Sequence, residues 1–434
     1  MKRSLLWLRH DLRIDDHPAL LRAAQARDHM VCLYCIDPRW FVADNWQSRR
    51  VGHHPWRFIH ESLVALSARL ETLGQRLVIR VGDPVAVVTQ LMRNHWIDKL
   101  VCSAPFGEEE RGQYLAIQNA LGHHRCEVLQ AQTLFEYQQL PFELSDLPAT
   151  FSQFRKAVAK HAFRPLYPAP QRLPPPLQLD SQALPPPFTV PNLQYQGGES
   201  AGKAHLAHYF ASDAPQSYKL TRNDLDEWSS STKLSPWLAQ GCLSARQVMA
   251  ALDHYQATVE KNGSTEWIGV ELLWREYFYW FALSSGPKLF AAGGRTGVRR
   301  HVSFYPERFA RWCAGETPFA IVNAAMRQLN HTGFLSNRLR QLVASALVHE
   351  LEIDWRYGAA YFQQQLIDHD LPCNWGNWQY LAGVGADPRG GRRFDLAKQT
   401  EMYDPDGRYR ARWQGEPVAI TEPLDEAGWP QPDG

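Results

Sequence analysis

The feature that most constrains the fold is a regular alternation of short apolar runs and helical patterns over the first 135 residues. Buried strands separated by amphipathic helices are typical of a parallel sheet that helices cover on both faces. We therefore predict a doubly wound α/β domain over residues 1–135. No G-x-G-x-x-G motif follows the first predicted strand, so a standard dinucleotide site is not expected. The predicted strands are Ser4–Leu8, Met30–Ile36, Leu77–Val81, Leu100–Ser103 and Glu127–Leu129, and the predicted helices are Pro18–Ala26, Val51–Leu73, Pro84–Asn94 and Glu108–Leu121.

A change in composition marks the end of this domain. Ten of the 29 prolines lie between Pro165 and Pro191, in a stretch that includes two Pro-Pro-Pro triplets. Proline removes backbone donors and disfavours helices, so residues 136–199 are predicted to form a semi-rigid connector. A proline-rich docking motif is the alternative interpretation of the same residues.

Helical periodicity dominates from about residue 200 onward. We predict an all-α domain over residues 200–415, followed by a polar tail over residues 416–434. The predicted helices of this domain are Ser235–Tyr255, Glu266–Ser284, Pro318–Leu329, Ser336–Leu351 and Arg356–Ile367.

Charge and cysteine usage limit the classes of protein. The formal net charge of +1 gives no argument for nucleic-acid binding from composition alone. The seven scattered cysteines favour reduced thiols in a cytoplasm, and no uncharged run is long enough to span a membrane. Cys32 and Cys35 fall on one predicted strand and should point to opposite faces, so we expect no metal site there.

Polar residues recur within apolar helical patterns of the second domain. Glu271, Trp274 and Arg275 share one face of a predicted helix, although an ordinary ion pair would explain that spacing equally well. The stretch Leu366–Tyr380 combines carboxylates, amides and indoles, and its proline and glycine predict a loop. Thr232–Ser235 precedes a helix and offers donors for phosphate. A cofactor with a flat polar ring and a pyrophosphate would suit all of these segments.

The order of these motifs resembles that of the photolyase/cryptochrome superfamily over nearly the whole chain. Trp7–His17 resembles the N-terminal signature, and Asn374–Tyr380 with Ala382–Arg389 most resembles the DASH-type cryptochromes. Tyr380 stands where dimer photolyases usually carry Trp, and Gln341 stands where they carry Met. The other matching stretches are Tyr218–Asn223, Ser231–Ala239 with Gly241–Ser244, Glu271–Glu276, Ala325–Phe334, Asn337–Arg340 and Ile353–Arg356.

The resemblance implies FAD as the cofactor. Arg340 and Asp368 would form an ion pair beside the flavin ring, and Asp370 would bind its polar edge. Asn374 would face flavin N5, where an amide can donate or accept a hydrogen bond. The other residues implied to bind FAD are Tyr218, Thr232, Lys233, Leu234, Ser235 and Arg275 at the phosphates, and Asn337.

The resemblance further implies light-driven repair of cyclobutane pyrimidine dimers in DNA, with a preference for single strands. A dimer would leave the base stack, which costs less in damaged or single-stranded DNA, and would stack on aromatic walls. Glu271 would hydrogen-bond the pyrimidine and stabilise its radical anion. The alternative is a blue-light receptor with a signalling role. Receptors of this family typically carry a long C-terminal extension, whereas only a polar tail follows Trp413 here. The residues implied to line the dimer pocket are Arg222, Glu271, Trp274, Asn337, Gln341 and Tyr380.

A chain of aromatic side chains is expected to supply electrons to the flavin. Trp378 and Trp355 match the first two members of the family's chain of three indoles. The third position aligns with Val302, which leaves Tyr305, Trp312 or another aromatic residue to take its place.

The N-terminal domain resembles the antenna domain of the family, which often binds a methenyl-tetrahydrofolate. Glu109 and Glu110 lie where contacts with the antenna are expected. An acidic cluster that begins a helix, favoured by the helix dipole, is the alternative interpretation.

Local basic clusters are the expected DNA contacts, because the chain as a whole is nearly neutral. The protein is predicted to be a monomer. Such clusters would position a strand through its phosphates without reading its sequence. Ordinary solvated surface is the competing interpretation. The clusters are Arg295, Arg299, Arg300 and His301, and Arg389, Arg392, Arg393 and Lys398.

Overall fold

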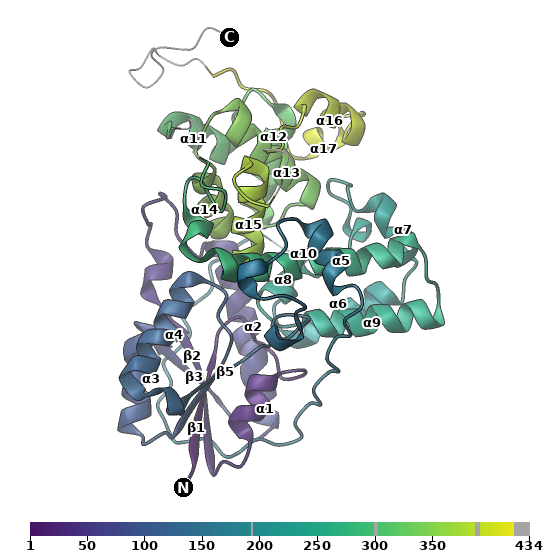
Figure 1. Ribbon diagram of the computed structural model, residues 1–434. Coiled ribbons are helices and arrows are strands. Elements are labelled where there is room, and N and C mark those ends of the chain that lie inside the picture. The colour runs from purple at the N-terminus through teal and green to yellow at the C-terminus, as the bar shows by residue number, and fades with distance from the viewer. Residues whose placement is uncertain (192–193, 299–302, 387–390, 421–434) are drawn as a thin grey trace.

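A computed structural model describes residues 1–191, 194–298, 303–386 and 391–420, and it shows a sheet domain below a helical domain (Figure 1). The five strands are all parallel, in the order β3-β2-β1-β4-β5. This order confirms the predicted doubly wound sheet. The strands are β1 (Arg3–Leu8), β2 (His29–Ile36), β3 (Leu77–Val81), β4 (Lys99–Ser103) and β5 (Cys126–Leu129).

Four helices cover the two faces of the sheet. Leu5 and Trp7 pack with α3 (Pro84–Asn94) and α4 (Glu108–Leu121), whereas Leu6 and Leu8 pack with α1 (Pro18–Ala24) and α2 (His53–Thr72). Cys32 and Cys35 likewise belong to opposite faces, as their spacing on a strand predicted. Among the described residues, no cluster of His, Cys, Asp and Glu could hold a metal ion.

The proline-rich segment lies along the sheet domain. Pro175 accepts a hydrogen bond from the backbone N–H of Met30, and Gln182 donates one to Ile79, at 3.1 Å each. These contacts tie the segment to β2 and β3. The predicted connector also contains a short helix, α5 (Phe151–Val158), which the proline count concealed.

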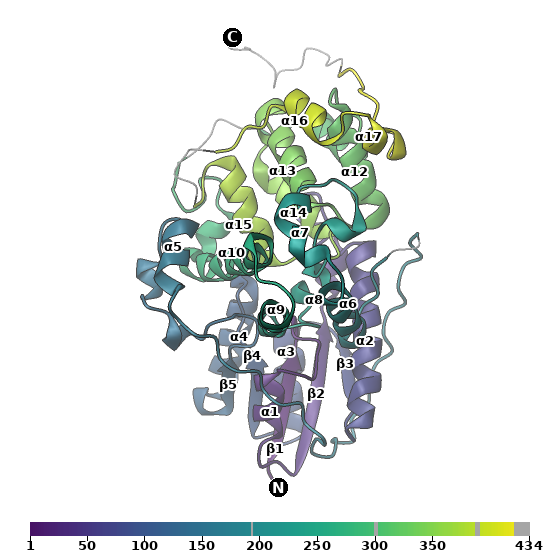
Figure 2. The same cartoon turned by 90° about the vertical axis from the view of Figure 1, so that its right-hand side faces the viewer.

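The helical domain lies over the carboxyl ends of the strands (Figures 1 and 2). One apolar core runs from the sheet into this domain, because residues of β1, β2, α10, α13 and α15 belong to a single buried cluster. No helix in the described part of the chain is long and apolar enough to cross a membrane. The helices are α6 (Glu199–Phe210), α7 (Ala214–Thr221), α8 (Ser235–Ala239), α9 (Ala245–Thr258), α10 (Gly263–Ser285), α11 (Pro306–Ala314), α12 (Ala320–Thr332), α13 (Asn337–Ser345), α14 (Trp355–Gln365), α15 (Leu371–Ala382), α16 (Leu396–Tyr403) and α17 (Arg408–Arg412).

The prediction of one continuous helix over residues 235–255 is wrong, because the chain leaves the helical conformation between α8 and α9. Gly241 has a φ of 65°, and a Cβ there would lie 2.1 Å from the carbonyl oxygen of His10. A residue with a side chain would be strained in this conformation and would clash with the sheet domain. The break therefore lets the helical domain approach the loop that follows β1.

The loop predicted around Pro372 and Gly376 is also wrong, since these residues lie inside α15. Asp370 caps this helix by accepting a hydrogen bond from the backbone N–H of Cys373, and Pro372 lies in the first turn, where no donor is required. A Cβ on Gly376 would lie 2.3 Å from Phe278 of α10. The glycine thus permits close packing of two helices rather than a turn.

Candidate functional site

A cavity of about 280 Å³ opens in the helical domain between α7, α8, α10, α13 and α15. Segments more than a hundred residues apart in the sequence meet around it. A second cavity of about 220 Å³ shares several of its lining residues and extends toward Leu238 and Arg275. The predicted residues that line the first cavity are Tyr218, Arg222, Thr232, Lys233, Leu234, Ser235, Glu271, Asn337, Arg340, Gln341, Asp368, Asp370, Asn374 and Trp378.

A buried carboxylate, that of Asp368, lines this cavity. Oδ2 of Asp368 accepts hydrogen bonds from Arg340 at 2.7 Å and from Ser235 at 2.6 Å. Arg340 is held in turn by a bond to the carbonyl of Leu335 at 2.9 Å. Oδ1 of Asp368 is buried and has no partner in the described part of the chain. A donor supplied by a ligand would satisfy that oxygen.

Lys233 brings a positive charge to the loop before α8. Its backbone has a φ of 52°, which is uncommon for a residue with a side chain. Burial lowers the pKa of this lysine to about 8, despite the acidic groups Asp226 and Asp224 nearby. The described residues provide no hydrogen bond or ion pair to its ammonium group. Lys233 could bind a phosphate group, and the free oxygen of Asp368 could accept a hydrogen bond from a ring. The two residues therefore fit a cofactor that has phosphate groups and also a ring with hydrogen-bond donors.

Glu271 lies where the cavity borders α7 and α10. Its Oε1 accepts a hydrogen bond from Arg222 at 2.7 Å and another from the indole N–H of Trp267 at 2.9 Å. Burial raises the pKa of this carboxyl, and Arg222 and Trp267 partly oppose the rise. The side chain of Glu271 remains 33% exposed, which leaves it accessible to a ligand.

Asp370 is the centre of a second polar cluster. The hydroxyl of Tyr279 donates to Oδ2 of Asp370, and Arg275 donates to the hydroxyl of Tyr279 at 2.6 Å. Arg275 also bonds the carbonyl of Gln132 at 2.7 Å, which links α10 to the sheet domain. The structure thus places Arg275 in the adjoining cavity, with much of its donor capacity used by the protein.

Asn374 and Trp378 line the cavity one helical turn apart on α15. The amide nitrogen of Asn374 donates to the carbonyl of Ala359 at 2.9 Å, which leaves its oxygen as an acceptor for a ligand. Trp378 lies edge-on to Trp312, with 6.4 Å between the ring centroids.

Trp355 does not line the cavity. It lies edge-on to Trp375 at 5.7 Å, and its indole N–H donates to Ala292. Val302 lies outside the described residues, and Tyr305, the N-cap residue of α11, does not line the cavity.

Trp274 and Tyr380 form a pair beside the cavity rather than part of its lining. Their rings are 6.0 Å apart with an interplanar angle of 73°. Trp274 also stacks on Phe151 at 3.8 Å, so the connector helix α5 supports it.

The two predicted antenna residues line a separate cavity between the sheet and helical domains. Glu109 is paired with Arg50, and Glu110 lies 3.0 Å from His10. Although burial opposes ionisation, His10 lowers the pKa of Glu110 to about 2. Both carboxylates also lie in the first turn of α4, where the helix dipole favours negative charge, so their position suits both interpretations.

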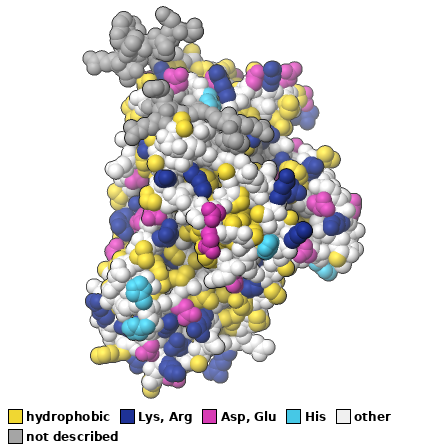
Figure 3. Space-filling model, viewed as in Figure 1, with side chains coloured by type: hydrophobic (Ala, Val, Ile, Leu, Met, Phe, Trp, Pro, Cys, Tyr) yellow, Lys and Arg dark blue, Asp and Glu magenta, His cyan; other side chains and the backbone are white. Residues whose placement is uncertain are grey.

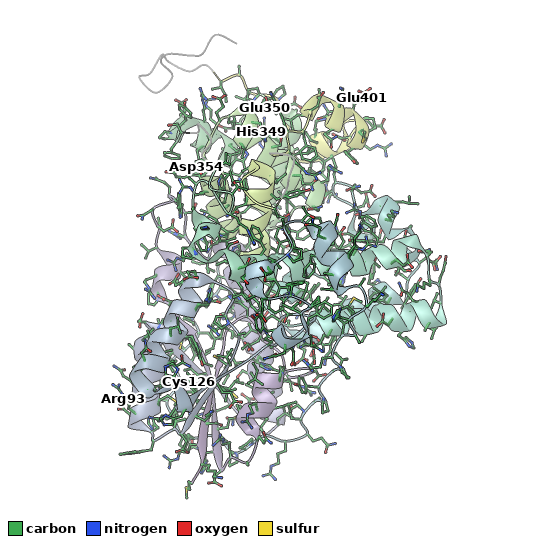
Figure 4. All side chains as sticks on the ribbon, viewed as in Figure 1. Arg93, Cys126, His349, Glu350, Asp354 and Glu401 are labelled. Carbon is green, nitrogen blue, oxygen red and sulfur yellow. The ribbon has the colours of Figure 1, made fainter. Side chains whose placement is uncertain are left out.

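The basic clusters are only partly described. Arg299, Arg300, His301 and Arg389 lie outside the described residues. Arg393 is paired at 3.0 Å with Glu350, which lies high in the helical domain (Figure 4). Lys and Arg side chains on the face in Figure 3 are scattered among acidic ones. Arg392 lies 4.7 Å over the ring of Tyr380, which places one cation at the aromatic pair.

Sequence reasoning missed several residues of the site, among them Trp267, Tyr279 and His369. Trp267 carries a detectable signal, because it precedes Glu271 by four residues on one helix. Tyr279 follows Arg275 by the same interval, but its partner Asp370 is remote in sequence. His369 lines both the first cavity and the cavity of Glu109 and Glu110. Its position depends on how the chain folds after α14, and no sequence pattern indicates it.

Comparison with protein families defines the class of this chain. Residues 4–176 match the family described as DNA photolyase, and residues 267–429 match the FAD binding domain of DNA photolyase. The second match contains most of α10 and all of α13 and α15, which form much of the cavity wall. The fold and the cavity are therefore those of an FAD-binding photolyase-type protein.

Full-length relatives place the chain more narrowly. It is 46% identical to the cryptochrome DASH of Idiomarina loihiensis, over 98% of this chain and 96% of that protein. It is also 46% identical to the cryptochrome DASH of Vibrio parahaemolyticus, over 99% and 97%. The chain belongs to the photolyase/cryptochrome family and, within it, to the cryptochrome DASH group, as its motifs predicted.

Solved structures agree with this assignment. A crystal structure of a Synechocystis cryptochrome matches with a TM-score of 0.92 and 37% identity, over 95% of this chain and 88% of that one. A class III photolyase from Agrobacterium tumefaciens matches with a TM-score of 0.81 and 26% identity, over 95% and 86%.

Proposed function

We propose that this protein uses blue light and FAD to repair cyclobutane pyrimidine dimers in DNA, preferentially in single strands. The observation that carries the proposal is the position of Glu271 and Arg222 in the same cavity as Asp368, Arg340 and Asn374. Asp368, Arg340 and Asn374 suit a flavin, and Glu271 and Arg222 offer a carboxyl group and a guanidinium to a pyrimidine.

The residues of the chain would hold the cofactor at both ends. Lys233 and the loop before α8 would bind the phosphates, and the ammonium group of Lys233 would make charge-assisted hydrogen bonds to them. Asp368 would accept a donor of the ring through its free oxygen, and Asn374 would present its amide oxygen. When bound and reduced, FAD would supply the light-excited electron that opens the dimer and would take that electron back once the two pyrimidines have separated.

Substrate recognition would depend on groups around the cavity. Arg222 would pair with a phosphate or a pyrimidine carbonyl, and Glu271 would hydrogen-bond the pyrimidine. Trp274 and Tyr380 would stack against the displaced bases, with Arg392 close to the phosphates. A preference for single strands follows because an unpaired dimer reaches the cavity without the cost of opening a duplex.

Two accessory parts complete the proposal. Trp378 would pass electrons toward the cavity during photoreduction, and a folate-type antenna would occupy the cavity of Glu109 and Glu110. All seven cysteines are free, which supports a reducing compartment such as the cytoplasm.

The proposal is tested by repair of dimer-containing oligonucleotides with the reduced, FAD-loaded protein under blue light. The Glu271→Ala variant should lose most repair of single strands while it retains FAD. The matched control is Glu266→Ala on the same helix, whose side chain is 61% exposed and lies 4.0 Å from Lys261. That control should repair at the wild-type rate.

The alternative function, a light receptor that signals without repair, makes the opposite prediction. Such a protein would bind FAD and photoreduce it, yet it would leave dimers intact in single-stranded and duplex DNA. Equal repair by the wild type and Glu271→Ala would instead place the reaction outside this cavity.

A further inference from the structure

Glu271 presents only one of its two carboxyl oxygens to the cavity. Oε1 already accepts two hydrogen bonds, from the guanidinium of Arg222 and from the indole of Trp267. Both of those groups are obligate donors that carry no lone pair for a carboxyl proton. Within the part of the chain that the structure describes, no protein group hydrogen-bonds Oε2.

Trp267 lies behind the carboxyl group rather than in the cavity. Arg222 and Glu271 line the cavity, whereas Trp267 does not. The indole contacts the carboxylate across one turn of α10, and two cations at the C-terminal end of α7 lie over its ring. Lys219 lies 4.9 Å and Arg222 lies 5.1 Å from the ring centroid, both within the range of a cation–π interaction.

We infer that Trp267 is a positioning residue, which orients Glu271 so that Oε2 alone meets the pyrimidine and carries any proton of the carboxyl group. The inference rests on the proposed repair function and extends it to a residue outside the cavity lining. With Oε1 held by two donors, the carboxyl group has one fixed orientation. A neutral Glu271 can then donate through Oε2, and an ionised Glu271 can accept there.

The charged neighbours support this arrangement. Burial raises the pKa of Glu271, while Arg222 and Trp267 act against the rise by favouring the ionised form. Tyr218 also faces this carboxyl group, and burial together with the charge of Glu271 raises the pKa of the phenol, which stays neutral. Loss of the indole N–H therefore removes one of two donors and should raise the pKa of Glu271 further.

The test replaces the indole N–H without removing the ring. Benzothienylalanine at position 267 has sulfur in place of the N–H, and Trp267→Phe gives the same loss with a smaller ring. The FAD-loaded protein is titrated in the dark by infrared spectroscopy, and the carboxyl C=O band of Glu271 is assigned by its absence in Glu271→Gln. The matched control is Trp413→Phe, which removes an indole bond to Asp226 outside the cavity lining.

The inference predicts that the midpoint of the Glu271 band moves to higher pH in both position-267 variants and stays unchanged in Trp413→Phe. Single-strand repair should fall roughly fivefold, about the effect of one lost hydrogen bond, and its pH profile should shift in the same direction. A midpoint that stays at the wild-type pH in both variants would overturn the inference. Because the dark titration uses no DNA, an inactive wild type would contradict the proposed function without affecting this result.

Discussion

The guanidinium of Arg340 lies 2.7 Å from Oδ2 of Asp368, and the Asp368 side chain is only 2% exposed. Loss of one partner from such a pair leaves an uncompensated buried charge. We expect Arg340→Met to lower the free energy of unfolding by about 3 kcal/mol and to reduce FAD retention. Urea unfolding and the ratio of flavin to protein absorbance measure both effects. Unchanged stability with full flavin content would show that the pair does not support the site.

Gly241 is predicted to be the most sensitive glycine between the two domains. Gly241→Ala must adopt a φ of 65° and bring a Cβ within 2.1 Å of the His10 carbonyl oxygen. We expect a loss of roughly 2 kcal/mol or more in the free energy of unfolding. Gly263→Ala is the control, since a Cβ there meets nothing within 4 Å. Equal effects of the two substitutions in thermal unfolding would contradict the tight approach.

Lys233 should make FAD affinity depend on pH. In the FAD-free protein its pKa is about 8, so the side chain is cationic below that pH and neutral above it. Binding of a phosphate above pH 8 must therefore take up a proton, and FAD affinity should fall as the pH rises through 8. Calorimetry of the FAD-free protein should show this decline, and Lys233→Met should bind roughly tenfold more weakly at pH 7 with little change up to pH 9.

If affinity of the wild type stays constant from pH 7 to 9, Lys233 does not contact the phosphates. Lys219→Met is a useful comparison, because that lysine lies over Trp267 and outside the cavity lining. Its affinity for FAD should keep the wild-type pH dependence.

Photoreduction should depend on Trp378, and the electron route should continue from Trp378 to Trp312. Trp378→Phe is expected to slow photoreduction of the oxidised flavin by at least tenfold, because no other Trp in the described part of the chain lines the cavity. Trp312 lies 6.4 Å from Trp378, so Trp312→Phe should also slow the process. Transient absorption on the oxidised protein measures these rates. Wild-type rates in Trp312→Phe combined with loss in Trp355→Phe would assign the route to Trp355 alone.

The sheet domain could be predicted from the sequence because its three inner strands, β1, β2 and β4, are buried on both faces and read as largely apolar runs. The helices α2 to α4 follow from their periodicity in the same way. Position 241 shows where such reasoning fails, because the need for glycine comes from His10, a residue of another domain. Gly376 likewise reads as a turn, although it serves the contact between α15 and Phe278.

The candidate site could be predicted mainly through the resemblance of its motifs to those of the family. From spacing alone, Glu271 and Arg275 are predicted only to form an ordinary ion pair on one helix. In the structure, each of them has different partners. Glu271 bonds Arg222 from α7, and Arg275 bonds Gln132 and Tyr279. Contacts between remote segments decide these partners, and periodicity within one helix carries no information about them.

The central claim is that light drives dimer repair in the cavity of Glu271, and dimer loss per dose of blue light tests it most directly. The reduced, FAD-loaded wild type is illuminated over a dimer-containing single-stranded oligonucleotide, with an identical sample kept in the dark. We predict that dimers disappear only in the illuminated sample and that Glu271→Ala prevents most of the loss. Intact dimers in the illuminated wild type, with flavin bound and reduced, would contradict the account and favour a signalling receptor.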